Sequence, residues 1–294
     1  MEQSTPWEFS DDRGRLAVAG ARPLRIVTYV QAGATLWDHG IRPVAVFGSQ
    51  HDGDAPDPAK TGELPLGEIR YLGPGGALDP DTLLEAAPDL VVAVTYDGEQ
   101  VYGLAPKTAL ELEAHVPVAA VAVGPGRGLA EVRERFAALA GSLGKGEPLG
   151  TARELDAAED LLRQVTGGPA RPRVLALSPG DRERVHLARP GAWPDLRALA
   201  EHGVELLEPA AGSGANWSTV GWAEAAGMRP DIVLSDERVN AARPGQLRGD
   251  EHWRALEATA RFLPWNPEPP CSRRAHTRFF TLVAETLREV AAGR

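Results

Sequence analysis

The chain has 294 residues, of which 43% are hydrophobic and 24% charged, a composition typical of a soluble globular protein long enough for two lobes. Its formal net charge of -10 at pH 7 disfavours nucleic acid and anionic membrane surfaces as partners, because both require a basic face on the protein. A single cysteine, Cys271, excludes an internal disulfide and cysteine-rich zinc sites.

Hydropathy and the N-terminal residues indicate where in the cell the protein is expected. No window approaches the ~20 apolar residues of a membrane-spanning helix, so we expect no membrane insertion. The N-terminus as written carries no export signal, which predicts a cytoplasmic protein. If an export signal was omitted from this sequence, we instead expect an extracytoplasmic, lipoprotein-like protein.

The first half alternates apolar runs with helical patterns. Runs at 23–30 and 42–48 predict buried strands on either side of a short helix that ends at Gly40. A loop rich in Gly, Pro and Asp follows over 49–68. The remaining pattern predicts strands at 69–73, 89–96 and 117–123 and helices at 79–87, 105–114 and 129–144.

A charged helix separates this half from a second one. Thr151 and Glu154 form a capping box ahead of an amphipathic stretch that stops at 167–169. The second half then predicts strands at 171–178, 204–209 and 230–236. Its expected helices lie near 195–203, 222–227, 252–260 and 277–292.

One sequence pattern occurs in both halves. LEAAPDLVVAVTYDG (84–98) is echoed by EAAGMRPDIVLSDER (224–238), each with a Pro-Asp step, an apolar run and a polar loop. The shared order predicts an α/β fold of two Rossmann-like lobes with mostly parallel sheets, joined by a single long helix. We expect an N-terminal lobe at 1–147, a linking helix at 148–168 and a C-terminal lobe at 169–294. Ligands of such sheets bind beyond the carboxyl ends of the strands, which predicts a ligand cleft between the lobes.

The order and spacing of several segments resemble one known family, the periplasmic substrate-binding proteins of iron–siderophore and cobalamin ABC importers. The matching segments are WEFSDDRGR, PLRIVTYV, GIRPVAVFG, LLEAAPDLVVAVTYDG, the helix at 151–165, RPDIVLSD and HWRALEATARFLPW. The resemblance covers nearly the whole chain. It implies a solute-binding protein that holds a ferric siderophore-like or other bulky small molecule, with neither cofactor nor catalytic residues. It also implies docking to an ABC permease, if the protein is exported, through Asp81 and Glu224; the family often has Glu at the position of Asp81.

Candidate ligand-binding residues follow the predicted strands. Aromatic walls with a few Arg or Tyr donors suit a bulky, partly anionic ligand, whereas the alternative is that many of these are ordinary loop or core residues. The candidates are Tyr29, Gln31, Phe47, Ser49, His51, Tyr96, Asp97 and Tyr102 in the first half, and Arg182, His186, Trp217, Trp222, Asp236 and Arg238 in the second.

Two other patterns have simpler interpretations. HDGDAPD (51–57) lacks the ligand spacing of a calcium loop and is interpreted as an acidic turn in solvent, so no metal site is expected. GPGRG (124–128) is interpreted as a plain loop, although its amides could hold an anion.

Two alternatives to a binding protein remain. Asp97 and Glu99 opposite Asp236 and Glu237 could form an acid–base pair, in which case the chain is a cytoplasmic enzyme or biosynthetic accessory protein on the same scaffold. A protein-interaction module, the other alternative, would require a large apolar surface patch. The sequence favours a binding protein over both.

Overall fold

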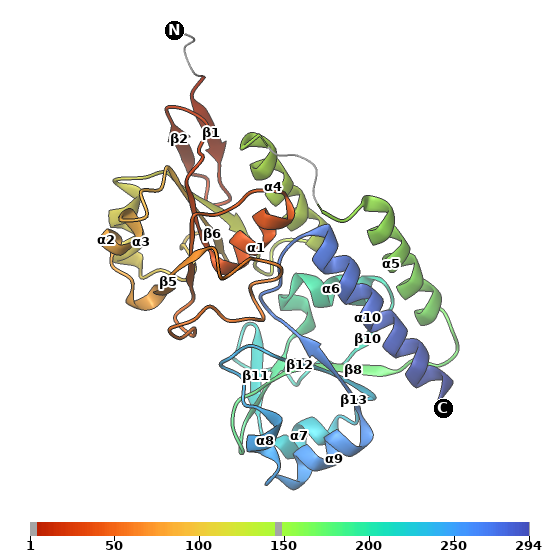
Figure 1. Cartoon of the computed structure of the whole chain (residues 1–294). Coiled ribbons are helices and arrows are strands. Elements are labelled where there is room, and N and C mark those ends of the chain that lie inside the picture. The colour runs from red at the N-terminus through yellow and green to blue at the C-terminus, as the bar shows by residue number, and fades with distance from the viewer. Residues whose placement is uncertain (1–4, 145–148, 294) are drawn as a thin grey trace. The chain divides into compact units, whose positions relative to one another are not determined.

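A computed structural model describes residues 5–144 and 149–293, which fall into two compact units (Figure 1). The N-terminal unit comprises Met1–Thr151 together with Glu268–Ala275, and the C-terminal unit comprises Ala152–Pro267 and His276–Arg294. Residues 145–148, where the first lobe was predicted to end, lie outside the described residues. The sequence-based boundaries place 268–275 in the second lobe and stay a prediction, as does a cleft shared by the lobes.

The N-terminal unit is built on a five-stranded sheet in the order β5-β4-β3-β6-β7, and every neighbouring pair is parallel. The expected parallel sheet is therefore confirmed. Its strands are β3 (Ile26–Tyr29), β4 (Ala45–Gly48), β5 (Arg70–Pro74), β6 (Leu90–Thr95) and β7 (Val118–Ala122). Its helices are α1 (Val30–Asp38), the 3-10 turn η1 (Gly75–Ala77), α2 (Pro80–Leu84), α3 (Pro106–Glu113) and α4 (Leu129–Ser142).

The central strands are buried along their whole length, which indicates that both faces of the sheet are covered. Every residue of β3, β4 and β6 is buried. Helices α1 and α4 contact each other, α1 packs on β3, β4 and β6, and α4 packs on β7. Leu36 and Phe136 of these helices are fully buried in the core.

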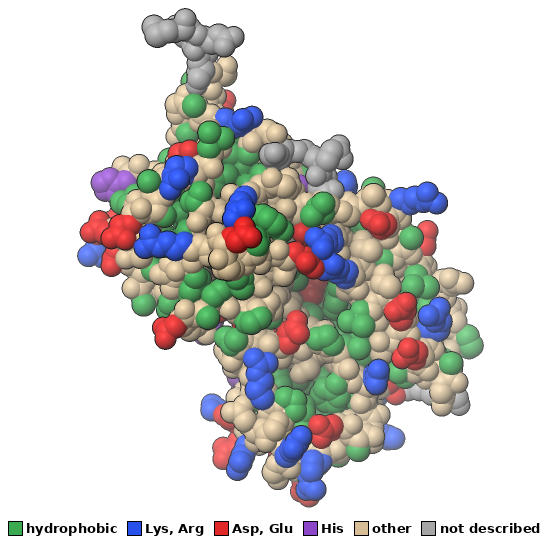
Figure 2. Space-filling view, viewed as in Figure 1, with side chains coloured by type: hydrophobic (Ala, Val, Ile, Leu, Met, Phe, Trp, Pro, Cys, Tyr) green, Lys and Arg blue, Asp and Glu red, His purple; other side chains and the backbone are tan. Residues whose placement is uncertain are grey.

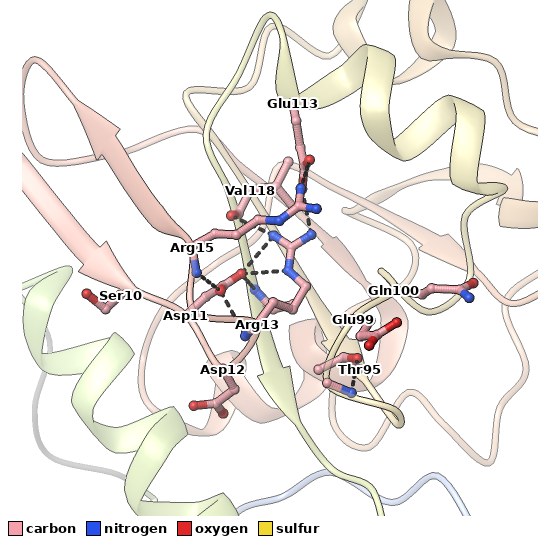
Figure 3. Close-up of polar contacts among 12 residues, drawn as sticks. Ser10, Asp11, Asp12, Arg13, Arg15, Thr95, Glu99, Gln100, Glu113 and Val118 are labelled. Carbon is pink, nitrogen blue, oxygen red and sulfur yellow. Dashed lines mark hydrogen bonds and ion pairs between the residues drawn. The ribbon is translucent and has the colours of Figure 1, made fainter.

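A two-stranded hairpin, β1 (Trp7–Ser10) with β2 (Leu16–Ala19), gives the WEFSDDRGR segment a structural role. Its turn lies along β7, where Asp11 Oδ2 and Asp12 Oδ2 accept hydrogen bonds from the amides of Ala120 and Ala122 at 3.1 and 2.8 Å. The side chain of Arg13 is buried and forms ion pairs with Asp11 at 2.7 Å and with Glu113 of α3 at 2.5 Å (Figure 3). The hairpin thus covers the edge strand β7, which would otherwise expose unpaired backbone groups.

The C-terminal unit contains a mixed sheet in the order β11-β9-β8-β12-β13, with β10 also paired to β8. Strands β8, β10, β12 and β13 are parallel, whereas β9 and β11 pair antiparallel; the sequence analysis missed β9, β11 and β13. The strands are β8 (Arg173–Pro179), β9 (Val185–Ala188), β10 (Glu205–Leu206), β11 (Trp217–Val220), β12 (Ile232–Asp236) and β13 (Arg261–Trp265). The helices are α5 (Ala152–Thr166), the 3-10 turn η2 (Pro190–Ala192), α6 (Pro194–Glu201), α7 (Trp222–Gly227), α8 (Pro244–Leu247), α9 (Glu251–Thr259) and α10 (Arg273–Ala292), which begins in the N-terminal unit.

Helices cover both faces of this second sheet. Figure 1 shows α7, α8 and α9 on one face and α6 and α10 on the other. Trp222 of α7 and Trp253 of α9 are buried with ring centroids 5.0 Å apart, next to Leu175 and Val233 of the sheet. The helix predicted between the halves is present as α5, with Leu155, Ala158 and Leu162 buried along one stripe.

The repeat seen in the sequence is confirmed within each unit. The first strand of each half, β3 or β8, lies between the second strand, β4 or β10, and the strand after the Pro-Asp step, β6 or β12. Within 5–144 and 149–293, every helix is too short or too polar to cross a bilayer. Basic and acidic side chains are interspersed over the face that Figure 2 shows.

Candidate functional site

A cavity of the N-terminal unit lies beyond the carboxyl end of β6. Its volume is about 380 Å³, within the range of small-molecule sites. Two tyrosine rings, one carboxylate and two side-chain amides supply its polar lining, and we call it the tyrosine pocket. The lining residues are Gln50, Gly76, Tyr96, Asp97, Gln100, Val101, Tyr102, Gly103, Leu104, Ala105 and Pro106.

The loop that follows β6 is shaped by Asp97. Its Oδ1 accepts hydrogen bonds from the amides of Glu99 and Gln100 at 2.8 and 2.9 Å and from the hydroxyl of Thr95 at 3.1 Å. Figure 3 shows Thr95, Glu99 and Gln100 in this turn. The turn passes through Gly98, whose φ of +77° suits glycine. The amide hydrogen bonds, those of Gln100 and Glu99 foremost, lower the pKa of the Asp97 carboxyl, so it is ionised at neutral pH.

The tyrosine rings pack edge to face. The ring centroids of Tyr96 and Tyr102 lie 4.8 Å apart at an interplanar angle of 71°, and Tyr102 in turn meets the buried Tyr29 at 5.4 Å. The amide of Tyr102 donates to the carbonyl of Val94 at 2.9 Å, which ties the second tyrosine back to β6. Aromatic stacking and this backbone bond together fix the wall of the tyrosine pocket.

Gly124 explains the start of the GPGRG loop. A Cβ at this position would lie 2.0 Å from the carbonyl oxygen of Tyr96, so only glycine allows the loop after β7 to approach the loop after β6. A Cβ at Gly126 would meet no atom within 4 Å. The loop therefore supports the wall of the pocket from behind.

Beneath this wall lies a buried ionic network, which we call the Lys60 cluster: Tyr29, Ser49, Asp52, Lys60 and Glu268. The Lys60 ammonium contacts Asp52 at 2.8 Å, the Ser49 hydroxyl at 3.0 Å and Glu268 at 3.3 Å. The Tyr29 hydroxyl donates to Glu268, and burial, together with this carboxylate, holds the pKa of Tyr29 well above its ordinary value. The five side chains satisfy one another in the buried interior.

The interpretation of HDGDAPD as a solvated acidic turn is wrong for two of its carboxylates. Asp52 is buried against Lys60, and Asp57 is buried as well. Lys60, from the following loop, supplies the positive charge that makes the burial of Asp52 possible. In the part of the chain that the structure describes, no group of three or more His, Cys, Asp or Glu side chains could hold a metal ion.

Residues 268–275 complete the N-terminal unit from the far end of the chain. Gln31 donates to the carbonyl of Pro269 at 2.9 Å, and the amide of Cys271 donates to Thr35 at 2.8 Å. Ser272 donates to Asp38 at 2.6 Å. Cys271 is buried in this contact.

In the C-terminal unit three tryptophans pack together, and one of them contacts a buried carboxylate. Trp193 lies 5.0 Å from Trp217 and 5.7 Å from Trp265, measured between ring centroids, and His186 lies 6.5 Å from Trp217. Asp195 accepts a hydrogen bond from Trp265 Nε1 at 2.7 Å. Burial raises the pKa of the Asp195 carboxyl to about 6, while burial, followed by Arg184, lowers that of His186.

The charged candidates of this unit have partners within it. Arg238 is buried and pairs with Asp236 at 2.8 Å, and Asp236 also accepts a hydrogen bond from Ser178 at 2.7 Å. Arg182 is exposed and donates to the carbonyl of Gln246 at 3.1 Å. Trp222 donates to the carbonyl of Asp181 at 2.9 Å and belongs to the core on the helical face.

The structure thus brings together some of the predicted ligand-binding residues. Tyr96, Asp97 and Tyr102 line the tyrosine pocket, whereas Tyr29, Gln31, Phe47 and Ser49 are buried behind it and His51 is exposed. Contact of each residue with a ligand stays a prediction. Asp81 and Glu224 are exposed in the first turns of α2 and α7.

Sequence reasoning missed several residues of both sites. Gln50, Val101 and Leu104 line the tyrosine pocket but have no sequence pattern that marks them as ligand-binding residues. Their only indication is their position in loops that follow predicted strands. Trp193 and Trp265 belong to the tryptophan group and could have been found as aromatic residues at the ends of predicted elements. Lys60 and Glu268 carry no local signal, because their partners lie far along the chain.

Comparison with known proteins identifies the fold. No family model and no curated protein sequence matches the chain. Among solved structures, the ferric-siderophore receptor DesE from Streptomyces coelicolor is similar over 96% of this chain and 98% of its own, with a TM-score of 0.84 and 23% identity. The siderophore-binding protein FhuD from Vibrio cholerae, solved with Fe3+-Desferal, covers 91% of this chain and 99% of its own (TM-score 0.64, 17% identity).

A heme-binding protein shares the same architecture. The periplasmic protein RhuT from Roseiflexus sp. RS-1 covers 91% of this chain and 98% of its own, with a TM-score of 0.64 and 16% identity. The chain therefore has the two-lobed fold of periplasmic binding proteins, as the sequence predicted. All three of these neighbours are described as receptors or binding proteins rather than enzymes.

Proposed function

We propose that the chain is a solute-binding protein of the ABC-importer type that holds a ferric siderophore-like chelate or another bulky small molecule. One observation carries this proposal. A pocket of about 380 Å³, walled by Tyr96, Tyr102 and Asp97, lies beyond the carboxyl end of β6 in a chain that shares its fold over 96% of its length with a ferric-siderophore receptor. Ligands of parallel α/β sheets bind at this end of the strands.

The carboxylates proposed as an acid–base pair are better suited to structural roles. Asp97 is ionised and shapes its own loop through three hydrogen bonds at one oxygen. Asp236 is buried in an ion pair with Arg238. A general acid or base must exchange a proton near the operating pH, which the lowered pKa of the Asp97 carboxyl disfavours, whereas Asp236 is occupied by its ion pair with Arg238 and its hydrogen bond from Ser178.

The proposal extends to location and to a permease. A binding protein that feeds an importer works outside the cytoplasm, and the neighbours FhuD and RhuT belong to periplasmic or siderophore-binding systems. Asp81 and Glu224 are exposed at helix N-termini, where a carboxylate is stabilised and accessible to a basic partner. We assign permease docking to these two residues.

Binding is tested by titrating the purified protein with ferric chelates and with heme while intrinsic fluorescence is recorded. Saturable quenching by at least one ferric chelate, weakened by Tyr96→Ala or Tyr102→Ala, is the expected result. Leu110→Ala serves as the control, because Leu110 is 68% exposed and lies outside the pocket. A protein that binds none of the chelates and shows no visible absorption when isolated from its native cells would refute the proposal.

A further inference from the structure

We propose that the tyrosine pocket receives a protonated amine of the ligand, so that the chelate is neutral or cationic and carries an alkylammonium arm. This inference rests on the proposed function and narrows it to one charge class. It excludes polyanionic chelates, such as ferric tris-catecholates, as the preferred ligand.

The charge of the pocket lining is the first argument. Asp97 is the one carboxylate among the eleven lining residues, which include neither Lys nor Arg nor His. Its three hydrogen bonds from Thr95, Glu99 and Gln100 all reach Oδ1, so within the described residues Oδ2 is left to accept from a ligand. A carboxylate in a pocket without a cation attracts an ammonium group and repels an anionic chelate.

The aromatic wall is the second argument. Ammonium groups bind over the faces of aromatic rings, and cages of such rings are a common site for alkylated amines. Tyr96 and Tyr102 meet at 71°, so their rings lie in two crossing planes of the same wall that holds Asp97. The side-chain oxygens of Gln50 and Gln100 add acceptors for an ammonium group, which carries three N–H donors.

The test compares two chelates that differ in one charge. The ferric complex of Desferal, a linear trihydroxamate that ends in a primary amine, is titrated beside the ferric complex of N-acetylated Desferal, in which the amine is neutral. We expect the wild-type protein to bind the amine-bearing complex about three- to tenfold more tightly, the range for a partly exposed charge pair beside aromatic rings. High salt should reduce this preference.

Asp97→Asn removes the charge and keeps the Oδ1 acceptor that shapes the loop. This variant should bind both complexes equally. Glu99→Gln is the matched control, because Glu99 lies two residues away and outside the pocket lining, and it should keep the preference. Circular dichroism and the melting temperature establish that both variants are folded.

The outcomes separate this inference from the function on which it rests. Equal binding of the two complexes by wild type, or tighter binding of a ferric tris-catecholate, would overturn the amine assignment while leaving a chelate-binding protein. A preference that survives Asp97→Asn would overturn it as well. Failure to bind any ferric chelate would instead remove the proposed function, and the amine assignment with it.

Discussion

Replacing Lys60 with Met tests the structural role of the Lys60 cluster. The ammonium group contacts Asp52, Ser49 and Glu268, and all of these side chains are buried. Methionine has a similar length but no charge, so the variant leaves two carboxylates in the interior without their cation. Breaking a buried ion pair from one side costs about 3–5 kcal/mol of unfolding free energy.

This loss converts to a shift of about 6–20 °C in the melting temperature at 2–4 °C per kcal/mol. Lys107→Met is the control: Lys107 is 87% exposed, its i,i+4 ion pair with Glu111 is screened by solvent, and its removal should leave the melting temperature unchanged within error. Adding Glu268→Gln to Lys60→Met should recover part of the loss, because it removes one uncompensated charge.

The assay must report on the N-terminal unit. Of the seven tryptophans only Trp7 and Trp37 belong to it, so fluorescence mainly follows the other unit. Amide hydrogen exchange of β3 and β4, with thermal circular dichroism, resolves the unit directly. If Lys60→Met shifts the melting temperature no more than Lys107→Met, the Lys60 cluster is not a stabilising element and the reasoning is refuted.

Three further predictions concern the pocket, the tryptophan group and the hairpin. Gly124→Ala should weaken chelate binding and lower the unfolding free energy by about 1–3 kcal/mol, because its Cβ would overlap the carbonyl of Tyr96. Gly126→Ala in the same loop should change neither quantity. Isothermal titration calorimetry measures the binding, and thermal melts measure the stability. Burial raises the pKa of Asp195 in the folded protein to about 6 from its ordinary value of 3.8, so its contribution to stability is present below pH 4 and is lost as pH rises through 6. Asp195→Asn should therefore stabilise the protein by about 3 kcal/mol at pH 7 and flatten the dependence of urea unfolding between pH 4 and 7; an unchanged dependence contradicts this assignment. Arg13→Ala should cost about 3 kcal/mol and speed amide exchange in β7, whereas Arg42→Ala, which breaks an exposed pair with Glu68, should change neither.

The sequence predicted the central strands, in which nearly every residue is buried. The continuous apolar runs of β3, β6, β8 and β12 are confirmed, because a strand covered on both faces needs no polar side. Strands β9 and β11 were missed because they are short and mix apolar with polar residues, and their pairing joins residues about thirty positions apart. In β13 the pattern is interrupted by Pro264, which is tolerated because this strand lies at the edge of the sheet.

The candidate site was predictable only where it follows a strand directly. Tyr96 and Asp97 come immediately after β6, so the rule for parallel sheets was enough to select them. Tyr29 and Ser49 also end strands, yet they face Lys60 and Glu268, and Glu268 lies 239 residues from Tyr29 along the chain. Local patterns cannot reveal that a distant segment returns to cover a strand end.

The Pro-Asp step shows why the two halves share one pattern. In each half the Asp begins the strand beside the central one: Asp89 accepts hydrogen bonds from the amides of Leu24 and Arg25 at 2.8 Å each, and Asp231 accepts from the amide of Arg173 at 2.7 Å. The amide of each Asp returns a hydrogen bond to the carbonyl of the same arginine, at 2.9 and 2.8 Å. A carboxylate and its own amide therefore fix the start of the central strand in both units.

The residue before each proline supports the same interpretation. Ala87 and Arg229 are the non-glycine residues of the described chain with positive φ, at 47° and 51°, and each precedes the proline of a Pro-Asp step. This backbone conformation is costly for residues other than glycine and persists where the surroundings hold it. The carbonyls of Ala87 and Arg229 accept from the guanidinium groups of Arg25 and Arg173, at 2.8 and 3.4 Å. The carboxylate, the turn and the arginine recur together in both halves, so the repeated pattern fixes strand register at the amino-terminal end of each parallel set of strands. The loops after β6 and β12 lie at the opposite, carboxyl end and are therefore free to differ.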